Sequence, residues 1–402
     1  MAASRDKPFQ MQTALAARHT VSGLNTSFCC AGMSFADYVA ASREMLRRVH
    51  AALPQDLRER TVAGNAPFEL IPDDDAARGR DGRWRRGVLL VHGLTDSPYL
   101  MRPLAEFFRQ QGFRVMAALL PGHGTQPGDL LDVRWQAWAD TVAWGAEQLG
   151  TEAEEIHLAG FSVGATLAVR HSLLDERVRG LFLFSPAFRV SFLAAWANLY
   201  KLYSWLSPAA PWLDVKPDDD PYKYESFAKN AAYQTHALIR DLNGRLKGRE
   251  VNIPVFAAAS ADDATVDSHA TLAFMARAQH ALSRLVYYTT EAAQLPAGVP
   301  PGRVEPVSSV VPDQNIVGFS HLSLVLPPED AHYGRNGDYS NCLHYFPGDM
   351  AKYAACRRNA PPLLQGEVTA EALRAGLMRR LTYNPHFCAL ESSMRQFIAN
   401  LP

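Results

Sequence analysis

The sequence lacks the features that would place the protein in a membrane or on nucleic acid. No stretch approaches the roughly 18 apolar residues of a membrane-spanning helix, and residues 1–25 lack the continuous apolar run of a signal peptide. Lysine and arginine number 40 and aspartate and glutamate number 41, so no excess charge would attract nucleic acid or an anionic bilayer. We therefore expect a cytoplasmic protein without an integral membrane segment, acting on a small, mostly neutral molecule.

Cysteine is scarce, and its spacing indicates no chemistry. The five cysteines, which match no zinc-binding or CxxC pattern, are Cys29, Cys30, Cys342, Cys356 and Cys388. We expect reduced thiols, because the N-terminus carries no secretion signal. A bridge between Cys342 and Cys356 is the alternative, since it would close a plausible loop. In either case the cysteines predict no metal site.

Hydrophobic residues, in contrast, make up 48% of the chain, which is enough for a large core without disulfides or metals. From residue 87 onward, short apolar runs alternate with amphipathic segments, a pattern typical of strand–helix–strand units on a parallel sheet. The predicted strands are 87–93, 113–121, 156–162, 178–188, 253–260 and 284–290. We predict an α/β fold with a mostly parallel sheet and helices on both faces.

The chain is expected to have four parts. Ser34, followed by Asp37 and an apolar stripe, predicts a capped amphipathic helix before the sheet. Residues 191–250 leave the α/β pattern and become aromatic at helical spacing, which indicates a helical insertion. The predicted parts are an N-terminal helical extension (1–60), an α/β core (61–190 and 251–330), a helical cap (191–250) and a C-terminal extension packed on the core (331–402).

Residues 160–164 read Gly-Phe-Ser-Val-Gly, which is a G-x-S-x-G motif. The motif lies between a predicted buried strand and a predicted helix, where a sharp turn needs small residues on both sides of a strained nucleophile. A helix that begins there would point its free N–H groups at the oxyanion formed when Ser162 attacks a carbonyl. The alternative is a serine that caps an ordinary helix. We predict that Ser162 is a nucleophile.

A serine hydroxyl is a poor nucleophile at neutral pH, so Ser162 needs a base and an acidic residue that orients the base. Asp263 follows the predicted strand 253–260, where the acid belongs if the chain order is serine, acid, histidine. Asp262 is its competitor. His321 lies further along the chain, after the last predicted strand. We predict Asp263 as the acid and His321 as the base.

The turn at residues 92–95 ends the first predicted strand and supplies the second donor of a predicted oxyanion hole. Its backbone N–H at Leu94 can join that of Val163 in an oxyanion hole. We interpret His92 as a structural residue, and His123 as a side chain that braces the loop after the next strand.

Residues 87–188 resemble the bacterial carboxylesterase and monoacylglycerol lipase branch of the α/β-hydrolases. The motifs that carry the resemblance are VLLVHGLTDSP, LLPGHGTQP and LAGFSVGA, supported by DDATV and FSH. The resemblance covers roughly residues 64–325 and implies the α/β-hydrolase fold, with the insertion 191–250 in the place of that branch's lid. It also implies a hydrolytic site made of Ser162, Asp263 and His321, with the N–H groups of Leu94 and Val163 as the oxyanion hole.

The sequence departs from this branch in three ways. Ser260 stands where relatives usually carry glycine three positions before the acid, and Ser320 stands where glycine usually precedes the histidine. The span from Asp263 to His321 is longer than usual. The N- and C-terminal extensions match nothing in the better-known members, so the resemblance does not transfer their specificity.

Aromatic side chains in the predicted cap are the best indication of the substrate, because they could wall an acyl pocket above Ser162. They are Phe192, Trp196, Tyr200, Tyr203, Trp205 and Trp212. The alternative is that they only pack the cap onto the core. We predict substrate contacts for Phe161, Trp196, Tyr200 and Trp205, and an apolar acyl group.

Together these features predict a serine hydrolase that cleaves small carboxylic esters and needs no organic or metal cofactor. A thioesterase, lactonase, amidase or acyltransferase would use the same residues. In a different class, a catalytically silent α/β-hydrolase would bind a ligand, and it would be expected to lack a member of the triad. A nucleotide-binding protein is disfavoured because the chain lacks the GxGxxG motif at this turn.

Overall fold

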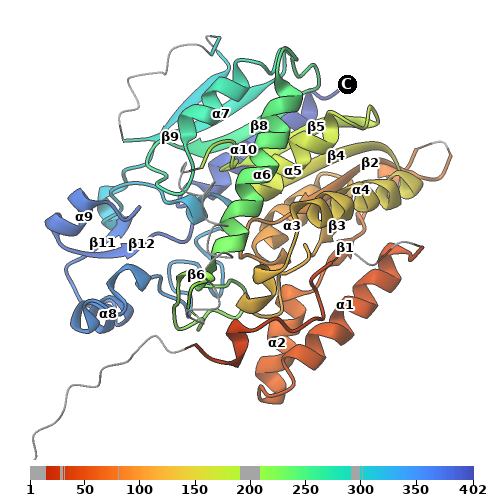
Figure 1. The fold of residues 1–402 in the computed structure, drawn as a ribbon. Coiled ribbons are helices and arrows are strands. Elements are labelled where there is room, and N and C mark those ends of the chain that lie inside the picture. Colours follow the sequence, from red (N-terminus) through yellow and green to blue (C-terminus); the bar gives the residue numbers. More distant parts are fainter. Residues whose placement is uncertain are drawn as a thin grey trace, which may run out of the picture.

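The computed structural model describes residues 15–402 except 28–29, 31, 80, 191–208, 291–298 and 301. Eight strands form a central sheet in the order β1-β3-β2-β4-β5-β8-β9-β10 (Figure 1). Only β1 runs antiparallel to its neighbour among these described strands. The strands are β1 (Phe68–Leu70), β2 (Trp84–Val91), β3 (Phe113–Ala118), β4 (Ala153–Phe161), β5 (Val178–Phe184), β8 (Val255–Ser260), β9 (Arg284–Thr289) and β10 (Val304–Ser308). The predicted α/β-hydrolase fold is confirmed.

Helices cover both faces of this sheet. Successive side chains of a strand point to opposite faces, so each central strand contributes apolar side chains to two cores. On β2, Leu89 and Val91 pack into one hydrophobic core, whereas Val88 and Leu90 pack into the other. The first face is covered by α4 (Trp135–Glu152), α5 (Val163–Ser172), α6 (Lys229–Leu246) and α7 (Ser268–Met275). The second face is covered by α3 (Arg102–Gln110) and α10 (Phe387–Ala399).

Two helices precede the sheet in sequence: α1 (Phe35–Val49) and α2 (Gln55–Asn65). Ser34 caps α1 by accepting the N–H of Asp37 at 3.1 Å, as the sequence predicts. Phe35, Tyr38 and Leu46 form the buried side of this helix. Helix α2 continues beyond residue 60, the predicted end of the N-terminal extension.

The insertion is only partly helical where the structure describes it. Strand β6 (Trp212–Asp214) pairs with β7 (Phe227–Ala228), and α6 then packs against α4 and α5 of the core. Trp212, one of the six aromatic residues that could wall an acyl pocket or only pack the cap, is buried and meets the ring of His19 at 5.0 Å between centroids. This contact agrees with the packing alternative, because β6 turns the side chain toward the N-terminal segment. The boundaries 191–250 for a helical cap stay a prediction.

The C-terminal region adds a small two-stranded sheet beside the core. Its elements, which Figure 1 shows gathered at one side of the molecule, are α8 (Met350–Arg357), β11 (Leu363–Gly366), α9 (Ala370–Ala375) and β12 (Leu377–Arg380). Strands β11 and β12 are parallel neighbours. The chain then returns to the main sheet through α10, where Phe397 meets the rings of Phe182 and Phe256.

A disulfide joins Cys342 to Cys356, with the two Cα atoms 6.0 Å apart. The expectation of reduced thiols is therefore wrong for this pair, and the alternative bridge is present. Cys356 is on α8, and both cysteines are buried with Tyr345 in a small cluster, which places the two side chains within bonding reach. Cys388 is exposed and unbridged, and Cys29 lies outside the described residues.

In the part of the chain that the structure describes, no helix has both the length and the apolar character required to cross a bilayer.

Candidate active site

Ser162 occupies a sharp turn between β4 and α5. Its backbone has φ 55° and ψ −116°, a conformation that costs a non-glycine residue free energy and that the surrounding structure must enforce. The N–H of Ser162 donates to the carbonyl oxygen of Phe184 on the neighbouring strand at 2.9 Å, which fixes the turn to the sheet. The turn raises the Ser162 side chain above the carboxyl ends of the parallel strands.

The two glycines of the motif are required by close backbone approach. A Cβ on Gly160 would lie 2.3 Å from the carbonyl carbon of Gly164. A Cβ on Gly164 would lie 2.1 Å from the carbonyl oxygen of Val91. Because real Cβ atoms do not approach backbone atoms so closely, only glycine fits on either side of the serine.

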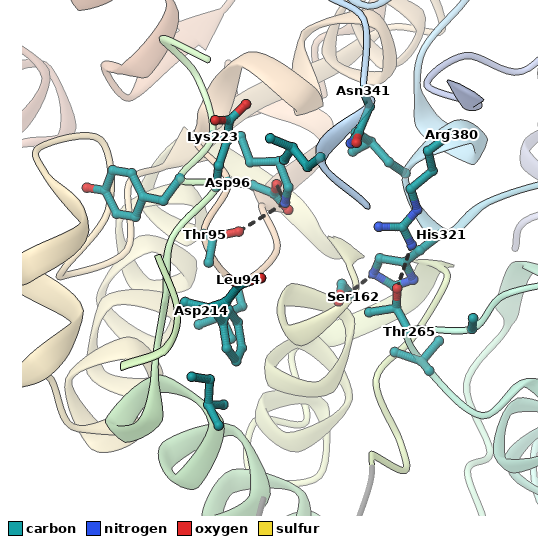
Figure 2. Close-up of a pocket in the computed structure, with 18 of the residues that line it drawn as sticks. Leu94, Thr95, Asp96, Ser162, Asp214, Lys223, Thr265, His321, Asn341 and Arg380 are labelled. Atoms are coloured by element: carbon teal, nitrogen blue, oxygen red, sulfur yellow. Dashed lines mark hydrogen bonds and ion pairs between the residues drawn. The ribbon is translucent and has the colours of Figure 1, made fainter. Parts of the chain in front are cut away.

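A chain of hydrogen bonds links the three residues predicted to form the triad. The Nε2 atom of His321 lies 2.9 Å from the Ser162 Oγ, and its Nδ1 lies 2.6 Å from an Asp263 carboxylate oxygen. Figure 2 shows the His321 ring facing Ser162 across the floor of a pocket. The geometry matches that of a serine nucleophile, a general base and a residue that orients the base.

The loop after β8 holds the Asp263 carboxylate in its ionised form. Its Oδ1 accepts the backbone N–H groups of Thr265 at 2.8 Å and Val266 at 3.1 Å. Burial alone would raise the pKa of Asp263, but the His321 imidazole and these N–H groups hold it below its usual range.

Asp262, the competing candidate, points elsewhere. Its carboxylate accepts the backbone N–H of Phe319 at 3.1 Å, and burial raises its pKa. Asp262 therefore braces the loop that leads to His321 and makes no hydrogen bond to the imidazole.

The two predicted oxyanion donors, Leu94 and Val163, line the same cavity as Ser162. Within the described residues, neither backbone N–H donates to a protein acceptor. The Leu94 turn is held by the next two residues, because Lys223 donates to the Thr95 hydroxyl at 3.0 Å and forms an ion pair with buried Asp96. Two free N–H groups beside the nucleophile are the arrangement that stabilises an oxyanion.

His92 and His123 brace the loops beneath the site. The Nδ1 of His92 donates a hydrogen bond to the Gly93 carbonyl oxygen at 2.8 Å, and its Nε2 accepts the Leu120 N–H at 3.1 Å. His123 bonds the Pro121 carbonyl at 3.0 Å, and burial lowers the pKa of its imidazole to about 4. Both rings are buried, so their contacts agree with the structural roles interpreted from the sequence.

A cavity of about 870 Å³ opens above Ser162. Apolar side chains that line it include Leu94, Val163, Val190, Leu213, Phe227 and Leu322. Phe161 is not among the lining residues; it is fully buried, and its ring lies 5.0 Å from that of His321. The substrate contact predicted for Phe161 is wrong, because the strand turns its ring into the core below. Phe192, Trp196, Tyr200, Tyr203 and Trp205 lie outside the described residues.

The C-terminal region contributes one wall of this cavity, which the sequence does not predict. Tyr339, Asn341, His344, Glu367 and Arg380 all line it. Figure 2 places Asn341 and Arg380 on the same side of the pocket as His321. No local motif marks these residues, because they reach the cavity through tertiary packing of a region far along the chain.

Glu225 also lines the cavity, and it predicts a pH dependence of stability. Burial, reinforced by Asp220, raises the pKa of Glu225 from 4.5 to about 7. The native state therefore keeps this proton to higher pH than the unfolded chain, and the stability it contributes is lost as the pH rises through about 7.

Glu225→Gln is therefore expected to change the thermal midpoint, relative to that of the wild type, more favourably at about pH 8.5 than at about pH 4. Glutamine preserves the oxygen that accepts the Tyr339 hydroxyl at 2.9 Å but replaces the oxygen that accepts the Asp219 N–H at 3.1 Å, a loss common to both pH values. Thermal denaturation at the two pH values measures the effect. An equal change at both values would mean that the carboxyl does not titrate between them.

No group of three or more histidine, cysteine, aspartate or glutamate side chains is arranged to hold a metal ion among the described residues.

Comparisons with known proteins place the chain in a family. The sequence profile described as serine aminopeptidase, S33, matches residues 82–291, just over half of the 402 residues. A thermostable monoacylglycerol lipase of Bacillus sp. (strain H-257) is 34% identical over 109 residues, which cover 27% of this chain and 44% of the relative. A carboxylesterase of Bacillus subtilis (strain 168) is 30% identical over 86 residues, covering 21% and 35%.

Each alignment thus spans less than half of the relative's length. The crystal structure of Paleococcus ferrophilus monoacylglycerol lipase is similar with a TM-score of 0.42 and 19% identity, over 56% of this chain and 88% of that chain. The profile match covers the strands and helices around Ser162 and extends to the loop of Asp263. The chain is accordingly a member of the α/β-hydrolase family described as serine aminopeptidase, S33.

Proposed function

We propose that the protein is a serine hydrolase that cleaves small carboxylic esters with an apolar acyl group through an acyl-enzyme on Ser162. The observation that carries the proposal is the hydrogen-bonded chain from Asp263 through His321 to the Ser162 hydroxyl, which opens on the cavity. The names of the two Bacillus relatives, a lipase and an esterase, support the same reaction class.

In the first step, His321 takes the Ser162 proton through Nε2 while the serine oxygen attacks the ester carbonyl. The N–H groups of Leu94 and Val163 stabilise the oxyanion that develops. His321 then gives the proton to the leaving alcohol, and the acyl group remains on Ser162. Asp263 stabilises the imidazolium cation throughout.

In the second step, His321 takes a proton from a water molecule, which attacks the acyl-enzyme. Collapse of the second tetrahedral intermediate releases the carboxylic acid and returns the proton to Ser162. Every proton transfer uses a side chain already in the triad, so the proposed chemistry requires no cofactor.

The proposal of an apolar acyl group is supported by aliphatic side chains among the lining residues of the cavity. Charged side chains from the insertion, such as Lys216 and Lys229, and polar side chains from the C-terminal region also line it. A thioesterase, a lactonase or an acyltransferase would use the same triad, and these remain the alternative activities. A silent binding protein is the alternative from another class.

The cytoplasmic location predicted from the sequence belongs to the same proposal. The disulfide between Cys342 and Cys356 weighs against it, because disulfides persist mainly in oxidising compartments.

The test compares the whole chain with Ser162→Ala on nitrophenyl esters of increasing acyl length. We expect KM to fall as the acyl group lengthens, and kcat to drop by about 10⁶-fold in the variant. Ser392→Ala, which removes an exposed hydroxyl on α10, is the matched control. Turnover of thioesters or lactones but not of esters would favour the alternative activities. Ligand binding without turnover of any of these would favour the silent protein.

A further inference from the structure

We propose that Glu367 and Arg380, from the C-terminal region, are positioning residues that hold the Asp263 loop and the His321 loop in their relative positions. This inference rests on the proposed function, because it assigns a role in the reaction of the same site. Both residues lie beyond the segment 82–291 that the family profile matches. They would make the C-terminal region a working part of the active site.

The Glu367 carboxylate joins the two loops directly. Its Oε2 accepts the backbone N–H of His321 at 3.3 Å and the backbone N–H of Ala264 at 3.4 Å. Ala264 directly follows the acid of the triad. One buried oxygen therefore contacts the backbone of both loops.

Arg380 completes this contact. Its Nη2 donates to Glu367 at 2.9 Å and to the Thr265 hydroxyl at 2.7 Å, the latter drawn beside His321 in Figure 2. The guanidinium thus neutralises the charge of the Glu367 carboxylate, whose side chain is only 4% exposed. Its bond to Thr265 is a second contact between the C-terminal region and the Asp263 loop. A buried carboxylate without such a partner would be strongly destabilising.

Backbone pairing independently fixes the strand that ends just before Glu367 and the strand that carries Arg380. Gly366 on β11 is the register partner of Arg380 on β12. Gln365 exchanges hydrogen bonds with the segment before His321, through Asn315 at 2.8 Å and Val317 at 2.9 Å. The β11–β12 sheet therefore pairs with the segment that leads to His321. The Glu367–Arg380 ion pair connects this sheet to the Asp263 and His321 loops.

Glu367→Gln and Arg380→Met are expected to lower kcat by about tenfold to a hundredfold with little change in KM, because a misplacement of about 1 Å in the catalytic groups is that costly. Glu371→Gln is the matched control, since it removes the same charge from an exposed site on α9 of the same region. Thermal denaturation of each variant shows that it is folded at the assay temperature. If Glu367→Gln is unfolded there, Thr265→Val removes one Arg380 contact and keeps the ion pair.

The pH profile of kcat/KM separates positioning from general loss of structure. The charged groups facing His321 are Asp263, the Asp96–Lys223 pair, and the Glu367–Arg380 pair. Removing the Glu367 charge leaves the guanidinium unpaired and disfavours the imidazolium, so the acidic limb is expected to move to lower pH. Arg380→Met leaves the carboxylate unpaired, and the limb is expected to move the other way.

The proposal is overturned if folded Glu367→Gln or, where that variant is unfolded, Thr265→Val keeps the kcat of Glu371→Gln. It is also overturned if both ion-pair variants shift the acidic limb in the same direction. These outcomes differ from a failure of the proposed function, in which the unmodified chain itself would hydrolyse no ester, thioester or lactone.

Discussion

His321→Ala is expected to lower kcat by about 10⁴- to 10⁶-fold while KM stays within a few-fold of its original value. The Nε2 atom, 2.9 Å from the Ser162 hydroxyl, is the base that makes this oxygen nucleophilic, and no second base is within hydrogen-bonding distance of that hydroxyl among the described residues. Steady-state kinetics on a nitrophenyl ester measures the loss. The residual rate would come from the oxyanion hole and substrate binding alone.

The matched control is His269→Ala, because the side chain of His269 is 84% exposed on the first turn of α7. This control is expected to retain full activity. The His321→Ala protein is expected to be folded in thermal denaturation, because Asp263 loses the imidazole but keeps the backbone N–H groups of Thr265 and Val266 as donors. A folded His321→Ala variant that keeps more than about a tenth of the activity would exclude His321 as the base.

Asp263→Asn is expected to lower kcat by about 10⁴-fold. The amide can donate to Nδ1 of His321, which favours the wrong tautomer and withdraws the lone pair that Nε2 needs. The substitution also removes the negative charge that stabilises the imidazolium. The KM is expected to change little, because the carboxylate does not line the cavity.

Asp262→Asn separates the two adjacent carboxylates. Asparagine keeps an oxygen that can accept the Phe319 N–H, now accepted by Asp262 at 3.1 Å, so kcat is expected to change by less than about tenfold. Kinetic comparison of the two variants decides which aspartate serves the triad. A larger loss in Asp262→Asn than in Asp263→Asn would reverse the assignment.

The predictable part of the site depends on local rules. Ser162 could be found from its pentapeptide because the turn needs glycine at 160 and 164, where the structure leaves no room for a Cβ. Asp263 could be found because the acid follows a buried strand, and His321 because it comes after the acid in chain order. The six inner strands were predictable from their continuous apolar runs, since the sheet is buried on both faces. The edge strands β1 and β10 were not predicted.

The unpredicted part depends on contacts between residues distant in sequence. Glu367 lies 46 residues after His321, and no periodicity or motif links the two. Phe161 adjoins Ser162 in sequence and Trp212 lies in the predicted cap, yet β4 and β6 turn both aromatic side chains away from the cavity. Composition alone could not decide between the free thiols and the Cys342–Cys356 bridge, because the decision depends on how the C-terminal region folds.

The most direct measurement is to treat the protein with a fluorophosphonate and locate the adduct by peptide mass spectrometry. We expect one adduct, on the Ser162 hydroxyl, formed at a rate that falls by orders of magnitude in His321→Ala. Ester hydrolysis that persists without any adduct, or an adduct on another serine, would contradict it.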